Sequence, residues 1–517
     1  MSVLAVATAF VLSLSVLLGG ATRQGYLGDV IVQIAACVLV GLAFWALSDP
    51  GRKPHFSRFD KALLGLVGLL CLVQVLPLFP GLGVKALDIP DVAGGTLIVS
   101  HSWWSRVSLT PAATWAGLVS AIVPVAVFVA VAQCDIAGRL LLWRVVLFLG
   151  GAAWLLGVLQ VMQGPYSSLR FFAVTNSSEA VGFFANRNHF AAQLYVTLAF
   201  FGAWIATTGR HLLQSRRIRG RFALVMGGAI AFLLLLVAGL AMTHSRAGLL
   251  IAMCTVLGIG AMTILPSVKV REGHSRRGGT RPVLLVLGFV VLIVVLFGLD
   301  QIVGRFQTDV ADNLRWHLSW VTLRTALSAL PFGTGIGSFM SVYGVIEDPA
   351  HVLREYVNRA HNDLAEFLLE AGILGAAVVV LFLMWFWRHL IPVWRDVQNT
   401  QDDFPLALQR AATLAIAGLL LHALLDYGLR TTALSALFAF SCGLLTRPPP
   451  SQASVLPAAK VSKKKTHASQ PLAQSPVGSP IAPELEPRPA AWEGHVSWPE
   501  QWKSTGKPSP HTPPRRL

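Results

Sequence analysis

The chain has 517 residues, of which 54% are hydrophobic and 13% are charged, and its formal net charge is +16. Soluble domains carry roughly 25% charged residues, so the excess of apolar side chains is expected to face lipid. This excludes an ordinary soluble protein. Most of the basic residues lie in short loops between apolar runs, where they bear on membrane orientation, so we expect no nucleic-acid partner.

Apolar runs long enough to cross the roughly 30 Å hydrocarbon layer recur along the whole chain. The first run lacks the basic start of a signal peptide, and we expect it to be a retained span. The predicted fold is an all-α polytopic membrane protein with about twelve transmembrane helices and a long extracytoplasmic loop that contains helices. The expected spans lie near 3–20, 29–47, 62–79, 112–132, 140–161, 189–207, 222–241, 247–265, 283–303, 372–388, 411–427 and 431–446.

Composition divides the chain into five predicted regions. An N-terminal transmembrane scaffold is followed by helices that border polar motifs, a long loop, further spans and a basic tail. The tail is rich in Pro, Ser, Ala and Lys and cannot bury a core, so we expect it to be disordered. The boundaries are 1–160, 161–303, 304–371, 372–446 and 447–517.

The distribution of Lys and Arg predicts the orientation. Of the 41 basic residues, 19 fall in one set of alternating loops and 12 in the opposite set, and five of those 12 lie in the long segment 304–371. Short cytoplasmic loops are the more basic ones. We therefore expect both termini on the cytoplasmic side of the membrane and the segment 304–371 on the outer face.

Polar motifs concentrate at helix ends on this outer face. They comprise Asn186-Arg187-Asn188-His189, Ser245-Arg246-Ala-Gly248, the glycine run Gly333/Gly335/Gly337, and His361-Asn362-Asp363. Ionisable groups at membrane depth are costly and usually functional.

Each motif also has a purely structural interpretation. Arg246 could extend to the headgroups, and the 186–189 motif could cap a helix, with Asn188 as the expected cap. His361 could be a structural histidine. The glycine run lacks the Lys-Ser/Thr of a nucleotide loop, and we interpret it as a flexible turn that lets the backbone approach a ligand or another helix.

The outer face offers no ATP, so group transfer there needs a donor that arrives activated. A polyprenyl-diphosphate saccharide has its diphosphate at the headgroup level, the depth expected for Arg246. Arginine stabilises a departing diphosphate through charge-assisted hydrogen bonds. A histidine is suited to take a proton from an acceptor hydroxyl, and His361 is the candidate base. No cluster with metal-ligand spacing is visible, so we expect metal-independent transfer without a cofactor.

These motifs resemble the O-antigen ligase / O-antigen polymerase superfamily, in its exopolysaccharide-associated form. The resemblance covers about 182–444 and rests on the four motifs above, on Arg315-Trp316, on Tyr356-Val-Asn and on 421–427. It implies a membrane-embedded (GT-C-like), metal-independent, inverting glycosyltransferase of the bacterial inner membrane, with its active site on the periplasmic face. Arg359 is a departure from the pattern, because relatives often have a His there.

The resemblance also implies roles for individual residues. His361 acts on the acceptor hydroxyl, and Arg246, Arg315 and Arg187 hold the donor diphosphate. The acceptor is a glycan or lipid A-core, and membrane lipids surround the site. Supporting roles fall to Asn186, Asn188, His189, Glu347, Asn362 and Asp363.

Two other classes of function remain open at this stage. A transporter or flippase of a lipid-linked anionic glycan would also use outer arginines, although it would be expected to show polar residues near the bilayer midplane in related halves. A non-catalytic partner-binding subunit would tolerate the loss of His361.

Overall fold

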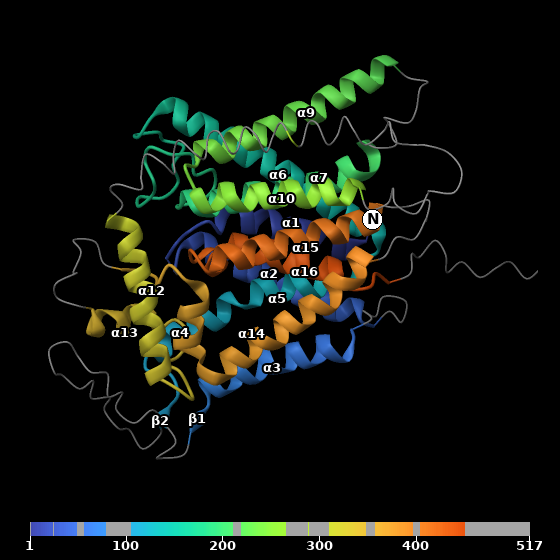
Figure 1. Cartoon of the computed structure of the whole chain (residues 1–517). Coiled ribbons are helices and arrows are strands. Elements are labelled where there is room, and N and C mark those ends of the chain that lie inside the picture. The colour runs from blue at the N-terminus through green and yellow to red at the C-terminus, as the bar shows by residue number, and fades with distance from the viewer. Residues whose placement is uncertain are drawn as a thin grey trace, which may run out of the picture. The chain divides into compact units, whose positions relative to one another are not determined.

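The computed structural model describes residues 2–23, 25–48, 56–78, 105–209, 219–264, 288, 310–347, 357–395 and 404–449. All of them belong to one compact unit, Met1–Leu456. The longest elements of this unit are helices that run side by side (Figure 1). They confirm the predicted helical, polytopic architecture. The predicted span 283–303, apart from residue 288, and the predicted tail from 450 onward lie outside the described residues.

The helices follow the predicted apolar runs closely. The N-terminal elements are α1 (Val3–Leu18), α2 (Leu27–Ala46), α3 (Arg58–Val75), α4 (Pro111–Ser120), α5 (Ile122–Gln133) and α6 (Ile136–Gln163), with the two-residue strands β1 (Pro77–Leu78) and β2 (Ser105–Arg106) paired antiparallel. The later elements are α7 (Arg187–Trp204), the π-helix η2 (Ile205–Gly209), α9 (Arg219–Met242), α10 (Arg246–Ile264), α12 (Val310–Ser328), α13 (Phe339–Ile346), α14 (Asp363–Arg395), α15 (Phe404–Ala423), the 3-10 turn η5 (Gly428–Arg430) and α16 (Thr432–Leu445).

Seven stretches of the described chain are long and apolar enough to cross a membrane. They are Leu27–Ala46, Pro111–Gln133, Ile136–Gln163, Arg187–Thr207, Arg246–Thr263, Asp363–Arg395 and Phe404–Ala423. Three shorter apolar helices, Val3–Leu18, Gly227–Met242 and Thr432–Leu445, accompany them. The protein is therefore a multi-pass membrane protein.

Helix α7 is the most enclosed of these helices. Every residue from Asn188 to Ala203 is buried, and α7 packs against α6, α9, α10 and α15. Small residues on its neighbours and on α7 itself allow the close approach: Gly150 of α6 lies against Thr197, and Gly202 lies against Ile259 of α10. Tight packing around small residues is the usual way in which helices associate in lipid. It holds the N-terminal end of α7, which carries the 186–189 motif, in a defined place.

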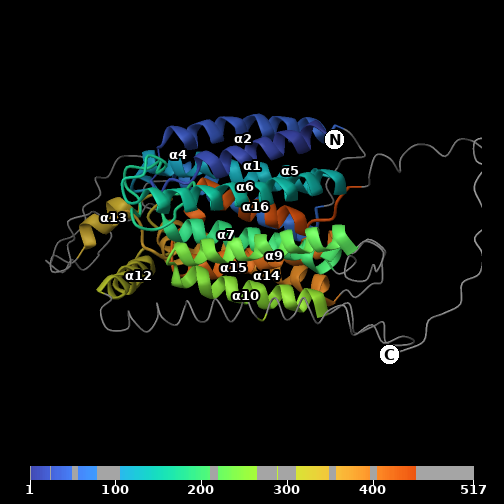
Figure 2. The same cartoon turned by 90° about the horizontal axis from the view of Figure 1, so that it is seen from above.

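Helices α12 and α13 lie beyond one end of the bundle (Figures 1 and 2). Figure 1 shows α12 crossing the direction of the long helices rather than continuing it. The predicted helical content of the long loop 304–371 is thus present in the part that the structure describes.

The glycine run closes against a break in α14. Gly372 interrupts that helix with φ +56° and ψ −141°, and its neighbour Ile373 donates its amide hydrogen to the carbonyl of Pro331 (2.8 Å). The amides of Thr334 and Gly335 donate to the carbonyls of Leu369 and Glu370, both at 2.9 Å. The glycine run thus approaches another helix, one of the two roles expected for it, and Gly333 and Gly335 are buried there.

This contact makes Gly372 intolerant of a side chain. A Cβ there would lie 2.3 Å from the Pro331 carbonyl oxygen, and the left-handed backbone alone costs an L-residue about 1–3 kcal/mol. We expect Gly372→Ala to lower the free energy of unfolding by at least that amount, measured by denaturant titration in detergent. The matched control is Gly344→Ala in α13, where a Cβ meets no atom within 4 Å. Equal stability of the two variants would contradict the packing described.

Candidate functional site

Three segments meet at the buried carboxylate of Asp426, in the turn between α15 and α16. The Nδ1 atom of His361 lies 3.2 Å from Oδ1, and the side-chain amide of Asn188 donates to Oδ2 at 2.6 Å. The amide of Tyr427 donates to Oδ1 at 2.9 Å. The side chain of Asp426 is 1% exposed and that of His361 is 21% exposed. The contact therefore joins a buried carboxylate to a histidine that solvent or a substrate can reach.

The surroundings of Asp426 keep it ionised. Burial opposes the charge, but the hydrogen bond to His361 and the electrostatic influence of the His361 and His189 imidazoles and of Arg315 hold the pKa of Asp426 well below its usual range. An ionised carboxylate accepts a hydrogen bond from a protonated Nδ1. Nε2 of His361 is then the ring nitrogen that has a free lone pair. This is the arrangement in which an aspartate orients a histidine that acts as a base.

His361 occupies an unusual backbone position. Its φ is +53°, in the left-handed region that few residues other than glycine adopt. The next residue, Asn362, accepts a hydrogen bond from the amide of Ala365 (3.0 Å) and so caps α14. The imidazole thus projects from a tight turn directly before a helix that is held in place by its cap. Strain of this kind clusters at functional sites.

Tyr427 lies between two imidazole rings. Its ring centroid is 4.9 Å from that of His361 and 5.0 Å from that of His189, both in edge arrangements. Its hydroxyl hydrogen-bonds with the side chains of Asn186 and Asn358, and burial is the main cause of its raised pKa. Tyr427 is thus a neutral phenol that links the segment before α7 to the segment before His361. His189 is fully buried, and neither ring nitrogen has a hydrogen-bond partner.

The cap of α7 differs from the one that we expected. Asn186 occupies the N-cap position and accepts a hydrogen bond from the amide of Asn188 (2.8 Å). The prediction that Asn188 caps the helix is therefore wrong, because its side chain is used by Asp426 instead. Asn186 precedes the first helical turn and still has extended backbone, as a cap requires.

The predicted arginines occupy different surroundings. The guanidinium of Arg187 pairs with Glu179, and its amide donates to Asn176 (2.9 Å), so Arg187 is bound within its own loop. Arg315 of α12 is half-buried and its charge acts on Asp426. Arg246 is half-buried and begins α10, directly after Ser245, whose hydroxyl accepts from the amide of Gly248 (3.1 Å). Diphosphate binding by all three stays a prediction.

The remaining predicted residues are Glu347 and Asp363. Glu347 is half-buried and terminates α13. Asp363 begins α14, accepts a hydrogen bond from the amide of Leu429 (2.9 Å) and lies 3.5 Å from Arg430. Asp363 thus connects the turn that carries His361 to the turn that carries Asp426.

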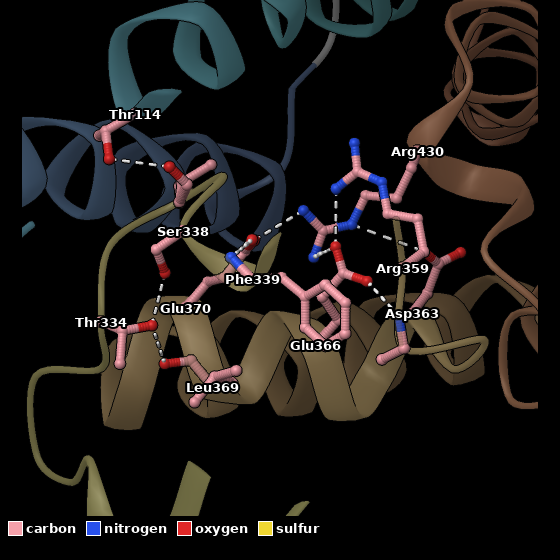
Figure 3. A network of polar contacts seen from close by, with 12 residues as sticks. Thr114, Thr334, Ser338, Phe339, Arg359, Asp363, Glu366, Leu369, Glu370 and Arg430 are labelled. Atoms are coloured by element: carbon pink, nitrogen blue, oxygen red, sulfur yellow. Dashed lines mark hydrogen bonds and ion pairs between the residues drawn. The ribbon is translucent and has the colours of Figure 1, made fainter. Parts of the chain in front are cut away.

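A second polar cluster, which the sequence analysis missed, holds these two turns together (Figure 3). Arg359 pairs with Glu366 (2.7 Å), and Arg430 pairs with Glu370 (2.7 Å) and lies 3.7 Å from Glu366. The second carboxylate oxygen of Glu366 accepts from the amide of Ala360 (3.0 Å). Burial alone would lower the pKa of Arg430, but its three carboxylate neighbours raise it.

The spacing of the three acids is the signal that could have revealed this cluster. Asp363, Glu366 and Glu370 are three and four residues apart, which places them on one face of a helix. Acids on a helix beside a membrane need basic partners. Arg359, which appeared as a departure from the family pattern, is one of those partners, and Arg430 is the other.

Within the described part of the chain, no three His, Cys, Asp or Glu side chains form a group that could hold a metal ion. The groups that the structure brings together at the site are the imidazole of His361, the buried carboxylate of Asp426 and Arg315, whose charge acts on Asp426. Such groups can move a proton at Nε2 of His361 and stabilise negative charge on a substrate.

The buried cluster generates a stability prediction. Arg430→Met removes one cation from three buried carboxylates, and the loss of one partner of a buried ion pair costs about 3–5 kcal/mol. We expect a fall of that size in the free energy of unfolding, measured in detergent. Arg324→Met, at an exposed position of α12, is the control and should change stability by no more than about 0.5 kcal/mol. Similar effects for both would show that the cluster contributes little.

Comparison with known families places this site in context. Residues 230–380 match the family model described as O-antigen ligase (Wzy_C). No curated protein matches the chain. The matched segment contains Arg246, Arg315 and His361, whereas Asn188 and Asp426, which contact or complete the site, lie outside it. The similarity to the O-antigen ligase family therefore lies within residues 230–380, which is less than half of the chain.

Proposed function

We propose that the protein is a glycosyltransferase that moves a saccharide from a polyprenyl-diphosphate donor to an acceptor hydroxyl. The acceptor is a glycan or lipid A-core, as for O-antigen ligases and surface-polysaccharide polymerases. The distribution of basic residues supports a site on the periplasmic face. The observation that carries the proposal is the contact between His361 and the ionised Asp426. His361 lies in the segment 230–380 that matches the O-antigen ligase family.

In the proposed reaction, Nε2 of His361 takes the proton of the acceptor hydroxyl while the hydroxyl oxygen attacks the anomeric carbon. The bond from that carbon to the diphosphate oxygen breaks, and its electron pair leaves with the diphosphate. Attack from the opposite side inverts the configuration. The diphosphate departs as an anion, so the leaving group needs no proton, and arginines rather than a metal are proposed to stabilise its charge.

Asp426 is a positioning residue in this scheme. Its carboxylate holds the Nδ1 proton and stabilises the imidazolium that forms when Nε2 accepts a proton. Asn188 and the amide of Tyr427 fix the carboxylate, and the Tyr427 ring limits rotation of the imidazole. The second buried cluster keeps the two turns that carry His361 and Asp426 in register.

Arg315 and Arg246 are proposed to receive the diphosphate. Arg246 begins α10, and Arg315 lies in the second turn of α12, where its charge acts on Asp426. Each preorganised donor to a developing anion contributes about 3 kcal/mol, roughly a hundredfold in rate. The ion pair between Arg187 and Glu179 makes Arg187 the weakest of the three candidates.

A transfer assay in liposomes tests the roles of His361 and Asp426. Loss of a general base lowers the rate by about 10²–10⁴, so His361→Ala should lose product at least a hundredfold. His389→Ala, in the last turns of α14, is the control and should remain active. Mass spectrometry of the product distinguishes ligation from polymerisation. Equal amounts of product from His361→Ala and wild type would show that His361 is not the general base and would favour a transporter.

Asp426→Asn separates orientation from folding. A neutral amide neither holds the Nδ1 proton in place nor stabilises the imidazolium that forms when Nε2 accepts a proton. We expect slower transfer with an unchanged KM for the donor and an unchanged free energy of unfolding. A free energy of unfolding that falls together with the rate would assign Asp426 a structural role only.

Arg246 is expected to contribute to binding and reaction of the diphosphate donor. We expect Arg246→Ala to weaken donor use more than Arg246→Lys does, because charge alone supplies part of the effect while the bidentate geometry is lost in both. Donor titration at saturating acceptor measures the difference. Equal activity of wild type and both variants would exclude Arg246 from the site.

A further inference from the structure

Helix α12 carries apolar residues on two opposite faces. Successive helical residues are rotated by about 100°, so positions 316, 320, 323 and 327 share one face. These positions are Trp316, Trp320, Leu323 and Leu327. The opposite face carries Leu318, Thr322, Thr325, Ala326 and Ala329, all of them buried.

Among the described residues, protein contacts cover the second of these faces and leave the first exposed. Leu318, Ala326 and Ala329 belong to a small core that includes Phe339 of α13 and Leu369 of α14. The first face is open: Trp316 is 76% exposed, Trp320 63% and Leu327 58%. Two adjacent tryptophans with leucine on one open face form an apolar surface of the kind that marks an interaction.

This open face leads directly to the membrane-facing surface of α14. Leu330, just after α12, is 40% exposed, and its neighbour Pro331 accepts the hydrogen bond from Ile373 (2.8 Å). Ile373 is 58% exposed and begins the long apolar part of α14, on which Val380 is also exposed. The apolar surface of a membrane-spanning helix therefore continues onto α12 without an intervening charged residue at the junction.

The edges of the face are polar. Arg315 and Arg324 lie on opposite flanks of the stripe by helical rotation, and α12 crosses the direction of the spanning helices (Figure 1). Tryptophan at the headgroup level, with arginine at the border of the apolar face, is typical of a helix that lies in the membrane interface.

We infer that α12 is an interfacial helix whose Trp316–Trp320–Leu327 face is immersed in the leaflet on the side of the site. Lipid acyl chains and headgroups are the occupant of this face. The helix then holds Arg315 at the headgroup level, which is the depth of a lipid-linked diphosphate. The role of Arg315 rests on the proposed function, whereas the lipid contact of α12 does not.

Spin labels test the lipid contact directly. Cysteine replaces Trp316 or Trp320 in full-length protein in which the accessible Cys37, Cys71 and Cys254 are changed to alanine, while the buried cysteines stay. The protein is reconstituted in phosphatidylethanolamine–phosphatidylglycerol vesicles. Collisions of the label with oxygen, which partitions into lipid, are compared with collisions with a water-soluble nickel complex. Val380→Cys is the lipid control and Ser178→Cys, at an exposed loop position, is the aqueous control.

We expect the oxygen-to-nickel ratio at 316 and 320 to exceed that at 178 several-fold and to approach that at 380. A ratio like that at 178 would overturn the inference, because the face would then be in water. Low accessibility to both reagents would also overturn it, because the face would then be covered by another protein segment.

A second measurement uses unlabelled protein and lipids that are brominated near the headgroup. Quenching of tryptophan fluorescence by these lipids should be smaller in the Trp316→Phe/Trp320→Phe double variant than in wild type. These readouts do not depend on glycan transfer, so they fail or succeed independently of the proposed function.

Discussion

A carboxylate that is almost completely buried needs hydrogen bonds to compensate for lost water, and the arrangement of the site follows from how Asp426 obtains them. Its partners come from the start of α7, from the turn before α14 and from its own neighbour in the chain. The first two partners, Asn188 and His361, belong to polar motifs that the sequence showed at helix ends. Asp426 cannot remain buried and charged without these hydrogen bonds. The contacts that stabilise its carboxylate therefore also hold His361 in a fixed position beside it.

The turns that carry His361 and Asp426 are held by a second set of contacts. The acids on the first turns of α14 bind Arg359 on one side and Arg430 on the other. The glycine run packs onto the break at Gly372 in the same helix, and Gln74 of α3 connects the two by accepting from the amide of Ile336 (3.1 Å) and donating to the Glu370 carbonyl (3.4 Å). The start of α14 is thus braced from several directions, which suits a histidine that must meet a substrate in a defined orientation.

Helix α12 connects this polar site with lipid. One of its faces completes the small core under the site, and the other continues the apolar surface of α14. Arg315 lies on the border between these faces and acts on Asp426. A donor with a lipid tail and a charged headgroup has the same division between apolar and anionic parts, and the site offers a matching arrangement of surfaces.

The sequence by itself determined the helical, polytopic fold and several residues of the site. The apolar runs predicted the helices because span length is a local property set by the thickness of the bilayer. His361, Asn186 and Asn188 were recognisable because polar residues at helix ends are conspicuous against an apolar background. The cap at Asn186 was misassigned, since either asparagine satisfies the local pattern and only the distant Asp426 decides between them.

What only the tertiary structure decided is the pairing of residues far apart in the chain. His361 meets Asp426 across 65 residues, and Asn188 meets it across 238. The pairing of Arg430 with Glu370, the contact of the glycine run with Gly372 and the open face of α12 are likewise invisible in local patterns. Helical periodicity shows which residues share a face, but which of two apolar faces is covered depends on the packing of the neighbouring helices.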